Sequence, residues 1–508
     1  MKVRKLIALF ILFSIMCSAG FVTQAEQLTS SEGPVDYQLS FEEALSEINA
    51  RHKAVTKPVF DWEEFKAKYA RDKEPRDFQL EIPEGPKTAG CLSVGQMKRD
   101  AYVLMYNLRK YYSLYDYYGG DEKFDAVLTE IEEAVTSAGE MDANEFSKFL
   151  LPHLSFISDK HFTLNRRNPS PYMITAFYRE VAFGKIGGKY VNLETGKEVK
   201  RVDGISELDS LFRLSLSDDC RLVYFPIVQI SIPFMEVTEQ LVSGILTEPA
   251  DTLHIVYSDN STQALSGFMD YRTIAALSSV EANIHETQSI PVLRTTQFDK
   301  SKQRKLMLDF LDAYRSSPSM VVDLRMNGGG YGWDVLAWFD SYTGRVTSGN
   351  RCTVQFGTLE SLYEKNRYGS LSSSEKDMLG KRLQAIDGSH VLMDVVLDEF
   401  IDNPNRLLIV LTAKHTASAS EWFVDYGYNV ENVLFVGDAS MGCLENSSTY
   451  TSVSLTYSHI PISMGTMATV FPDGDYFQEG RGFLPDIWVP ATEAEDLICG
   501  FLQKQQAG

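Results

Sequence analysis

A short run of small and hydroxyl residues at positions 416–421, "TASASE", follows the apolar run "RLLIVLTA" and precedes the aromatic "WFVDYGY". The apolar run predicts a buried strand, and the residues after Ser418 begin a helical pattern. Ser418 stands three residues before Glu421, which is the spacing of a helix capping box. A serine hydroxyl at such a strand-to-helix turn can also act as a nucleophile. The turn by itself favours the cap.

A second turn ends the apolar run "VVDLRMNGGG" at residues 321–330. Its three consecutive glycines allow backbone N–H groups to approach a ligand closely. The two turns together offer the hydroxyl of Ser418, the N–H of Ala419 and an N–H of Gly329. Two such N–H groups are what an oxyanion hole requires. The pairing of the turns therefore favours a nucleophile at Ser418 over a simple cap.

The elements that must position these turns alternate in type after residue 289. The runs "IPVLRTTQF", "SMVVDLRM", "NRLLIVLTA" and "NVLFVG" predict buried strands, and "QRKLMLDFLDAYRSS" predicts a helix between the first two. This alternation predicts a mixed α/β core over residues 289–508 with mainly parallel pairing. Residues 349–400 are expected to form a helix-bearing insertion in it.

Two further regions precede the core. Apolar residues recur at helical spacing in "DAYVLMYNLRKYYSLYDYY", "FDAVLTEIEEAV" and "NEFSKFLLPHLSFI", which predicts a three-helix region over residues 93–171. Residues 172–288 alternate short β-rich runs with glycine turns, which predicts a small β domain. Its phrase "VKRVDGIS" resembles the I-x-x-I-N-G element of PDZ domains.

The chain begins with Lys2, Arg4 and Lys5 ahead of an apolar stretch at residues 6–16. This layout predicts a secretory signal peptide over residues 1–25, and residues 26–92 then read as an N-terminal arm or pro-segment. A lipid anchor on Cys17 is an alternative, although Ser-Ile-Met before it fits a lipobox poorly. The apolar stretch is shorter than the roughly 20 residues that a membrane span needs, and so no transmembrane segment is expected.

The composition limits the class of partner. The 508 residues are 44% hydrophobic and carry a net charge of −21, which argues against nucleic acid as a partner because phosphate binding needs a basic face. The cysteines after Cys17 are odd in number and widely scattered, without the paired spacing of a zinc site. We therefore expect no structural metal and no cofactor. These cysteines are Cys91, Cys220, Cys352, Cys443 and Cys499.

Four blocks, "VVDLRMNGGG", "TASASE", "LFVGDASMG" and "QEGRGFLPDIWV", occur in this order, and they resemble the C-terminal processing (tail-specific) and tricorn-type serine peptidases. The resemblance covers roughly residues 95–165 and 290–490. It implies a ClpP/crotonase-like core, an N-terminal helical region and an inserted PDZ-like domain. It further implies peptide or unfolded-protein substrates, and it allows a homo-oligomer.

The chain departs from the processing branch at the general base. The lysine that this branch places after "V-G-E-x-T" aligns with Cys443, and a thiol cannot replace an amine as the base. "LSFISDKHFTL" resembles the block that supplies the catalytic histidine in the tricorn-like branch, which implies His161 as the base. "QEGRGFLPD" likewise implies Glu479 as the acid that orients it. Lys160 replaces the serine that connects the two in tricorn-like enzymes, and so the path from Glu479 to His161 stays open.

Other residues receive structural interpretations. Asp323 and Arg325 are expected to form an ion pair, Asp486 to be a turn residue, and Cys443 to have no chemical role. A catalytically silent binding protein on the same fold remains a rival, and a lipase-like hydrolase is disfavoured because no G-x-S-x-G surrounds Ser418. Seven of the eight histidines are not expected to act as the base. We expect four at the surface, namely His52, His254, His285 and His390, and we expect His153 in the core. His415 is too close to Ser418 in sequence to align with it, and His459 is expected on a strand.

Overall fold

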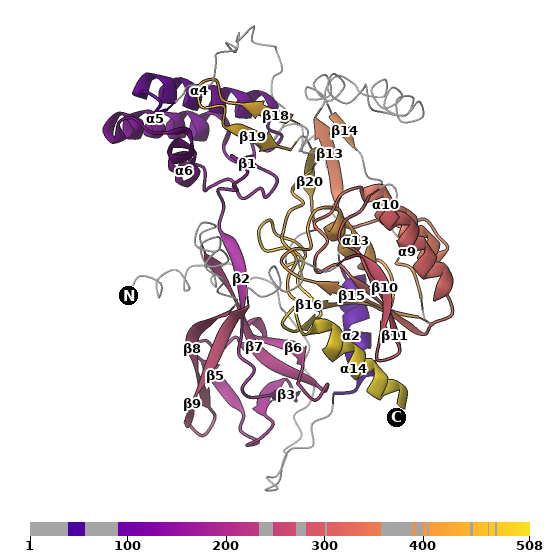
Figure 1. Ribbon diagram of the computed structural model, residues 1–508. Coiled ribbons are helices and arrows are strands. Elements are labelled where there is room, and N and C mark those ends of the chain that lie inside the picture. The colour runs from indigo at the N-terminus through magenta and orange to yellow at the C-terminus, as the bar shows by residue number, and fades with distance from the viewer. Residues whose placement is uncertain are drawn as a thin grey trace.

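The computed structural model describes most of the chain in three spatial units (Figure 1). The main parts of a helical unit, a β unit and an α/β unit follow one another along the sequence, although α2 (Phe41–Lys53) and a late pair of strands each join a unit that is distant in sequence. The predicted signal peptide, most of the arm and most of the insertion at 349–400 lie outside the described residues. The described residues are 39–55, 90–232, 247–270, 281–299, 302–356, 390–392, 400–403, 406–447, 451–465, 467–472 and 475–507.

The α/β unit is built on strands in the order β10-β11-β12-β15-β16-β21. β10 pairs antiparallel with β11, and each later neighbour pairs in parallel, as the alternation of strands and helices predicts. The middle strands β12 and β15 are apolar along nearly their whole length because helices cover both faces of the sheet. The strands are β10 (Asn283–Thr287), β11 (Ile290–Arg294), β12 (Ser319–Asp323), β15 (Leu407–Thr412), β16 (Val433–Gly437) and β21 (Ile487–Trp488).

Helices on the two faces of this sheet bury separate apolar clusters. One face packs against α9 (Lys302–Ala313), α10 (Gly332–Thr343) and α13 (Ala419–Gly427), with Trp338 and Phe423 among the buried side chains. The other face packs against α2 (Phe41–Lys53) and α14 (Ala494–Ala507). The mixed α/β fold expected from the sequence is therefore confirmed.

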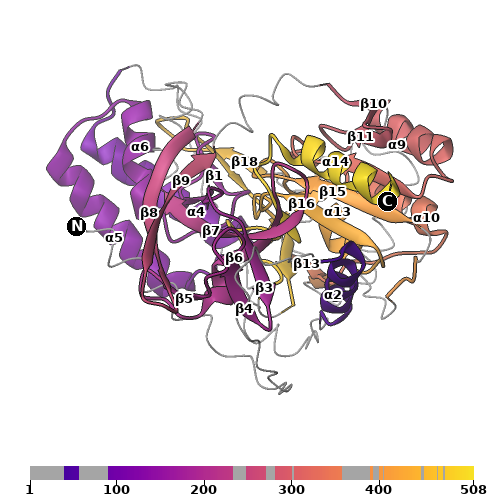
Figure 2. The same ribbon diagram turned by 90° about the horizontal axis from the view of Figure 1, so that it is seen from below.

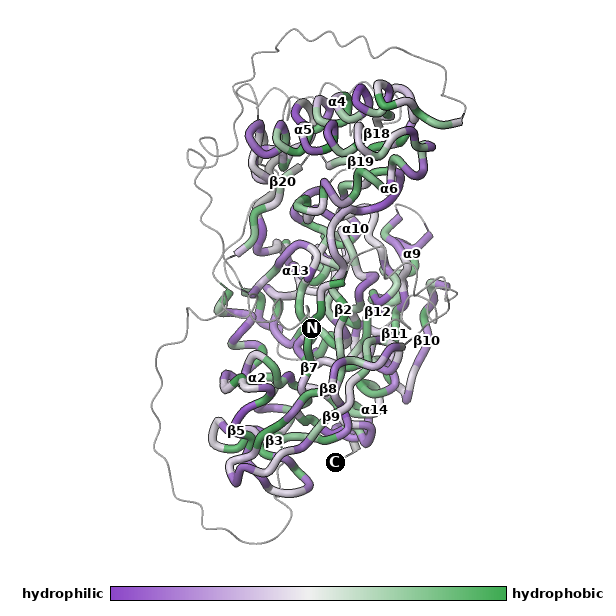
Figure 3. Tube along the Cα trace, turned by 90° about the vertical axis from the view of Figure 1, so that its left-hand side faces the viewer, coloured by the Kyte–Doolittle hydropathy of each residue, from purple (hydrophilic) through white to green (hydrophobic). Residues whose placement is uncertain are grey.

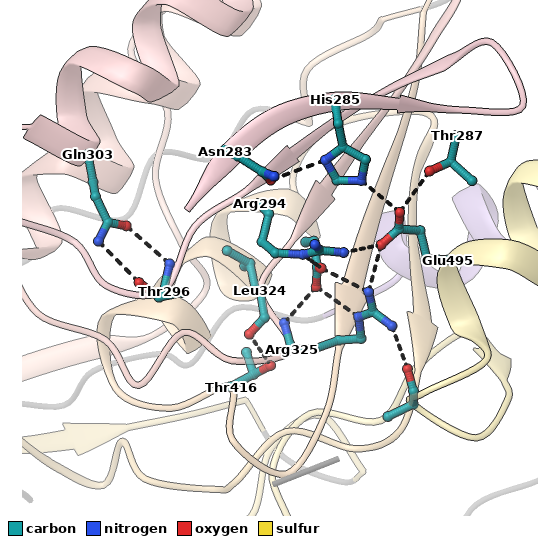
Figure 4. Close-up of polar contacts among 12 residues, drawn as sticks. Asn283, His285, Thr287, Arg294, Thr296, Gln303, Leu324, Arg325, Thr416 and Glu495 are labelled. Atoms are coloured by element: carbon teal, nitrogen blue, oxygen red, sulfur yellow. Dashed lines mark hydrogen bonds and ion pairs between the residues drawn. The ribbon is translucent and has the colours of Figure 1, made fainter. Parts of the chain in front are cut away.

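Polar contacts fix α14 to the ends of β10, β11 and β12 (Figure 4). Glu495 on α14 receives bonds from His285 at 2.8 Å and from Arg325 at 2.8 Å. Arg325 also donates to Asp323 through Nε at 2.9 Å, and both residues are buried, so the predicted ion pair is confirmed. His285 was expected at the surface, and its side chain is partly exposed while its Nε2 atom contacts Glu495.

Helix α2 belongs to the α/β unit, and this corrects two expectations. His52 is buried and its Nε2 atom lies 3.0 Å from Oδ1 of Asp486, so His52 is not a surface residue. Asp486 also accepts the N–H of Phe435 at 2.9 Å, and so it links β16 to α2 and is more than a turn residue. Ser40 caps the helix through a capping box with Glu43.

The β unit continues the same hydrogen-bonded sheet. Trp488 of β21 pairs in parallel with Ser215 of β6, and the order then runs β6-β7-β2-β9-β8-β5, with β3 and β4 beside β7. Its buried side chains form a core of its own around Phe183, Phe212 and Ile255. The elements are β2 (Tyr172–Phe177), β3 (Phe183–Ile186), β4 (Lys189–Asn192), β5 (Val199–Val202), η2 (Leu208–Ser210), β6 (Phe212–Leu216), β7 (Leu222–Ile232), β8 (Thr247–Tyr257) and β9 (Thr262–Asp270).

The three predicted helices of the helical unit are confirmed as α4 (Val94–Tyr111), α5 (Gly120–Ala138) and α6 (Ala143–His153). Polar and apolar segments alternate along α4 and α5, as amphipathic helices require (Figure 3). Capping boxes at Ser93 and Asp142 begin α4 and α6.

Late strands return to the helical unit. Strand β1 (Thr163–Leu164) pairs with β19 (Pro461–Met464), which pairs with β18 (Thr451–Ser454). Ile462 and Met464 join the apolar core of the helices. The expected unit 289–508 therefore contributes these strands to its neighbour.

A four-stranded sheet in the order β14-β13-β20-β17 lies beside α10 and α13 in Figure 1. It joins the edge of the insertion to later strands. The view from below in Figure 2 shows α5 and α6 on one side of the molecule and α9 and α10 on the other. Within the described residues, no helix is long and apolar enough to cross a membrane, and no group of three or more metal-ligating side chains gathers. The strands are β13 (Cys352–Phe356), β14 (His390–Leu392), β17 (Asn446–Ser447) and β20 (Met467–Val470).

Candidate active site

Ser418 stands between β15 and α13 in a strained backbone conformation. Its φ of 55° and ψ of −120° lie outside the regions that a serine ordinarily occupies. Such strain persists only where the surroundings hold it, and it gathers at functional sites. Glu421 accepts the N–H of Ser418 at 3.1 Å, as the capping spacing predicts. The turn thereby presents the hydroxyl away from the strand, at the start of the helix.

The glycine turn lies directly against the nucleophile turn. The N–H of Ala417 donates to the carbonyl of Asn327 at 3.2 Å, and the Thr416 hydroxyl donates to the carbonyl of Leu324 at 2.8 Å. Figure 4 shows the second of these contacts. Gly329 has a φ of +101°, and a Cβ there would stand 2.7 Å from the Cβ of Ser418. Only glycine allows this approach.

The two predicted oxyanion donors differ in the structure. Among the described residues, the N–H of Ala419 meets no acceptor, and it opens helix α13 as expected. The N–H of Gly329 instead donates to Oδ1 of Asn327 at 2.9 Å. In this state of the site, the asparagine side chain therefore occupies the N–H that was expected to face the oxyanion.

His161 lies within reach of Ser418 although 257 residues separate them in sequence. The distance from Nε2 of His161 to Oγ of Ser418 is 3.3 Å. The histidine sits in the loop between α6 and β1, in the helical unit, and its ring reaches the nucleophile of the α/β unit. Its own N–H donates to Oδ1 of Asp159 at 2.8 Å, which fixes the backbone of the loop.

The imidazole of His161 also contacts the side chain of Cys443. Its sulfur lies 3.3 Å from Nδ1 and 3.6 Å from Nε2 of His161. Since a sulfur on the Nδ1–H axis would be much farther from Nε2 than from Nδ1, Cys443 lies against the side of the ring. The sequence predicted no chemical role for Cys443, and it did not indicate this position beside the imidazole. Burial raises the pKa of the Cys443 thiol well above its ordinary value, and nearby carboxylates add to that rise, so the neutral thiol is favoured.

Burial also decides the charge of His161. Removal from water lowers the pKa of its imidazole, while the charge of Asp159 and a hydrogen bond to the backbone of Asn446 raise it. The net pKa is below the ordinary value, so the ring is neutral at pH 7. A neutral imidazole with a free lone pair on Nε2 is the form that can accept a proton from serine.

Glu479 does not touch the imidazole of His161 in the described part of the chain. Its Oε1 atom accepts the N–H of Lys160 at 2.8 Å, one residue before the histidine. Its Oε2 atom accepts the N–H groups of Leu444 at 2.9 Å and Glu445 at 2.8 Å. Glu479 therefore contacts the histidine loop through the backbone N–H of Lys160, along the path that the sequence left open.

Burial raises the pKa of Glu479 well above its ordinary value, and the charges of Glu445 and Asp159 add to that rise. The hydrogen bonds from the backbone act in the opposite direction because they favour the carboxylate. Burial likewise raises the pKa of Glu445, to about 7, and that of Glu421. Several buried carboxyls thus lie behind the catalytic pair.

Sequence reasoning missed two buried charges here. Asp159 accepts bonds from the Tyr112 hydroxyl at 2.8 Å and from Nδ2 of Asn446 at 2.9 Å, besides the N–H of His161. Its position two residues before the histidine was the available signal. Lys414 is buried at the end of β15, where Nζ donates to the carbonyls of Ser440 at 3.0 Å and Arg481 at 2.8 Å. Burial lowers its pKa to about 8.

The remaining histidines lie away from the proton path. His415 is half-buried beside the glycine turn, and burial lowers the pKa of its ring. His459 is exposed in the turn between β18 and β19. His153 lies 3.2 Å from Glu130, and His254 lies 3.3 Å from Asp203 at the surface of the β unit. The side chain of His390 lies outside the described residues.

Comparisons with known proteins locate the family in the α/β unit. Residues 289–489 match the model of peptidase family S41. No curated protein matches the chain. Among solved structures, mature CPAF complexed with lactacystin is 13% identical, with a TM-score of 0.41, over 82% of this chain and 97% of that one.

Two other solved structures resemble the chain at a similar level. The photosystem II D1 C-terminal processing protease is 14% identical, with a TM-score of 0.33, over 79% of this chain and 96% of that one. The tricorn protease is 11% identical, with a TM-score of 0.33, over 82% of this chain and 37% of that one. The region that carries Ser418, the glycine turn and Glu479 belongs to peptidase family S41, and the chain is a serine-type peptidase.

Proposed function

We propose that the chain is an endopeptidase in which Ser418 attacks the peptide carbonyl and His161 acts as the general base. The observation that carries the proposal is the distance of 3.3 Å between Nε2 of His161 and Oγ of Ser418. A base must lie within hydrogen-bond reach of the proton it removes, and contacts in an unliganded site are often long. The strain at Ser418 adds support because it aims the hydroxyl at one place.

The proposed reaction assigns a group to each step. His161 takes the hydroxyl proton as Oγ of Ser418 bonds to the substrate carbonyl carbon, and the carbonyl oxygen becomes an oxyanion beside the N–H of Ala419. The imidazolium then gives its proton to the leaving amine, and an ester of Ser418 remains. Water, deprotonated by the same imidazole, attacks that ester and releases the carboxylic product and Ser418.

The second oxyanion donor comes from the glycine turn. Gly329 can serve when the oxyanion displaces Oδ1 of Asn327 from its N–H, because an anion is a stronger acceptor than an amide oxygen. This exchange keeps the buried N–H paired in both states. The N–H of Gly329 thus bonds to Asn327 when the site is empty and to the oxyanion when substrate is bound.

The tautomer of His161 is set without a carboxylate on the ring. Its hydrogen bond to the backbone of Asn446 raises the pKa of the ring, as donation of a ring N–H to a carbonyl does. Since Nε2 faces Ser418, Nδ1 is the donating atom. A backbone carbonyl on Nδ1 is a common way to hold the proton there.

The substrate and the compartment are further parts of the proposal. We infer that peptides or unfolded proteins are cleaved outside the cytoplasm, after removal of residues 1–25. Sequencing of the mature N-terminus should begin near Glu26. A lipid-modified chain that begins at Cys17 would contradict this cleavage site.

A fluorophosphonate probe tests the nucleophile. The wild type should be labelled and should cleave a denatured protein, and Ser418→Ala should abolish both. Ser420→Ala is the matched control, because Ser420 is buried two residues away and its hydroxyl has no hydrogen-bond partner in the described structure. Absence of labelling and cleavage in a folded wild type would instead support the silent binding protein.

A further inference from the structure

Four consecutive backbone N–H groups at residues 442–445 point at two buried carboxylates. The first two meet one carboxylate and the last two meet the other, so the segment spans the gap between them. The contacts are Gly442 to Glu421 at 2.7 Å, Cys443 to Glu421 at 2.8 Å, Leu444 to Glu479 at 2.9 Å and Glu445 to Glu479 at 2.8 Å.

Each carboxylate also holds one member of the catalytic pair through the backbone. Glu421 accepts the N–H of Ser418 at 3.1 Å. Glu479 accepts the N–H of Lys160 at 2.8 Å, next to His161. A continuous chain of hydrogen bonds therefore runs from the nucleophile, through the segment, to the base.

We propose that Glu421 and Glu479 are positioning residues that set the distance between Ser418 and His161 through residues 442–445, which we call the amide bridge. The proposal rests on the roles of Ser418 and His161 given above. It assigns Glu479 a mechanical role in place of direct contact with the imidazole. It gives Glu421, which the sequence presents as a cap, an equal part.

The number of donors explains why both residues must be carboxylates. Glu421 accepts four bonds, two on each oxygen, with the Ser440 hydroxyl at 2.6 Å as the fourth donor. A carboxylate can accept at both oxygens, whereas a glutamine would direct its NH₂ group at donors. Loss of an acceptor would leave buried N–H groups unpaired, which structures rarely tolerate.

The amide bridge also carries a side chain to the base. Cys443 lies in the middle of the bridge, and its sulfur contacts the ring of His161 at 3.3 Å. A shift of the amide bridge would therefore move the sulfur that packs against the imidazole, together with the loop that carries His161. A displacement of about 1 Å at a catalytic pair can cost on the order of 10²-fold in rate.

Beyond the amide bridge, Ser440 connects Glu421 to the segment that follows Glu479. Its hydroxyl accepts the N–H of Phe483 at 2.8 Å, and its carbonyl accepts Nζ of Lys414 at 3.0 Å. Both glutamates therefore act on one connected polar cluster. Substitutions within such a cluster are not additive.

Glu421→Gln, Glu479→Gln and the double variant test the bridge. Each single variant should lower kcat on the order of 10²-fold. The double variant should be about as slow as the slower single variant, since either change breaks the same connection. The acid limb of the pH profile should not move in Glu479→Gln, because the imidazole of His161 meets the Asn446 backbone and not this carboxylate.

Asp425→Asn is the matched control. Asp425 is buried on the same helix as Glu421, but it pairs with Arg351 and the Tyr476 hydroxyl away from the bridge. It should lower thermal stability and leave the kcat of the folded fraction within a few-fold. Equal losses of kcat in all three single variants would overturn the proposal.

Hydrogen exchange gives a readout independent of activity. The amides of residues 442–445 should be protected in the wild type and exchange faster in either glutamine variant. If one glutamine variant does not fold, the rate of hydrogen exchange at residues 442–445 in the other variant tests the proposal. Labelling of the wild type by fluorophosphonate with full kcat in Glu421→Gln would reject the bridge alone, whereas absence of labelling would reject the proposed function.

Discussion

The nucleophile turn at residues 413–421 and the histidine loop at residues 155–162 are built in different ways. The turn is held by backbone and side-chain bonds to the glycine turn of the neighbouring strand, within one unit. The loop is held by side chains that come from other parts of the chain, among them Glu479 and Tyr112. The sheet thus fixes the nucleophile, whereas contacts between units fix the base.

This difference divides the expected effects of substitutions. A change in the nucleophile turn meets a rigid, strained neighbourhood, since Ser418 and Gly329 both have positive φ. A change behind the histidine loop acts through hydrogen bonds that can rearrange. Four substitutions test the comparison, from the largest effect to the smallest.

His161→Ala should have the largest effect, because it removes the proton acceptor that faces Ser418. We expect kcat/KM to fall about 10²–10⁴-fold, the usual contribution of a general base. Labelling by fluorophosphonate should slow in parallel. His459→Ala, an exposed histidine on a neighbouring element, is the control and should stay within a few-fold of the wild type.

The pH profile of the wild type also tests His161 as the base. Burial lowers the pKa of His161, so the neutral base should persist below the ordinary histidine pKa of about 6.5. The acid limb of kcat/KM should therefore lie below that pH. A limb above it would show that the imidazole is stabilised as a cation and would contradict its desolvated setting.

Gly329→Ala should come next, on the nucleophile side. The new Cβ would stand 2.7 Å from both the Ala417 carbonyl and the Cβ of Ser418, so the nucleophile must move. We expect a loss of kcat on the order of 10²-fold, as for a displacement of about 1 Å. Gly344→Ala is the control, because Gly344 also has positive φ but nothing lies within 4 Å of its Cβ position.

Both glycine variants should lose about 1–3 kcal/mol of unfolding free energy, because alanine is strained at positive φ. Only Gly329→Ala should lose activity beyond that. Denaturant unfolding and kcat, measured on the same preparations, separate the two effects. Equal kcat in the two variants would show that the close approach of the turns is not needed.

The sequence predicted the nucleophile side better than the base side, and the reason is physical. "TASASE" and the glycine turn follow strands whose periodicity is local, so their convergence follows from parallel pairing. The contacts of Glu479 with Lys160, Leu444 and Glu445 are made by backbone N–H groups, which leave no mark in residue types. The family resemblance therefore pointed to Glu479 near His161 but left open how the two residues are connected.

The same limit explains His52. Its segment reads as a charged arm, because only Ala44, Ile48 and His52 of helix α2 are buried. The pairing with Asp486 joins residues 434 positions apart, and no periodicity connects them. Residue spacing reports local elements, and long-range ion pairs lie beyond it.

His52→Ala should mainly reduce stability. It removes a partner of the buried Asp486 and a ring that packs against both Tyr428 and Phe435, with an expected cost of about 2–4 kcal/mol in unfolding free energy. Activity should stay close to the wild type at low temperature, since α2 lies on the face of the sheet opposite α13. Chemical denaturation checks the first expectation and kcat the second.

The pH dependence of stability follows from Asp486. Burial raises the pKa of Asp486, but the charges of His52 and Arg51 outweigh it, so the folded pKa is below the ordinary value. The stabilisation is therefore complete above the unfolded pKa of about 3.9 and is lost as the pH falls through the folded pKa. The His52→Ala variant should show a weaker loss in acid than the wild type.

Cys443→Ala should have the smallest effect on the rate. The thiol lies against the side of the imidazole and does not occupy the Nδ1–H axis, to which the proposed tautomer assigns the Asn446 backbone. Loss of the sulfur leaves the N–H of residue 443 on Glu421 intact, so the amide bridge remains. We expect kcat within about tenfold of the wild type, because the imidazole loses a packing contact but keeps its contact with the Ser418 hydroxyl. A loss as large as that of His161→Ala would show instead that the thiol takes part in proton transfer, and the pH profile of Cys443→Ser would then have to shift with it.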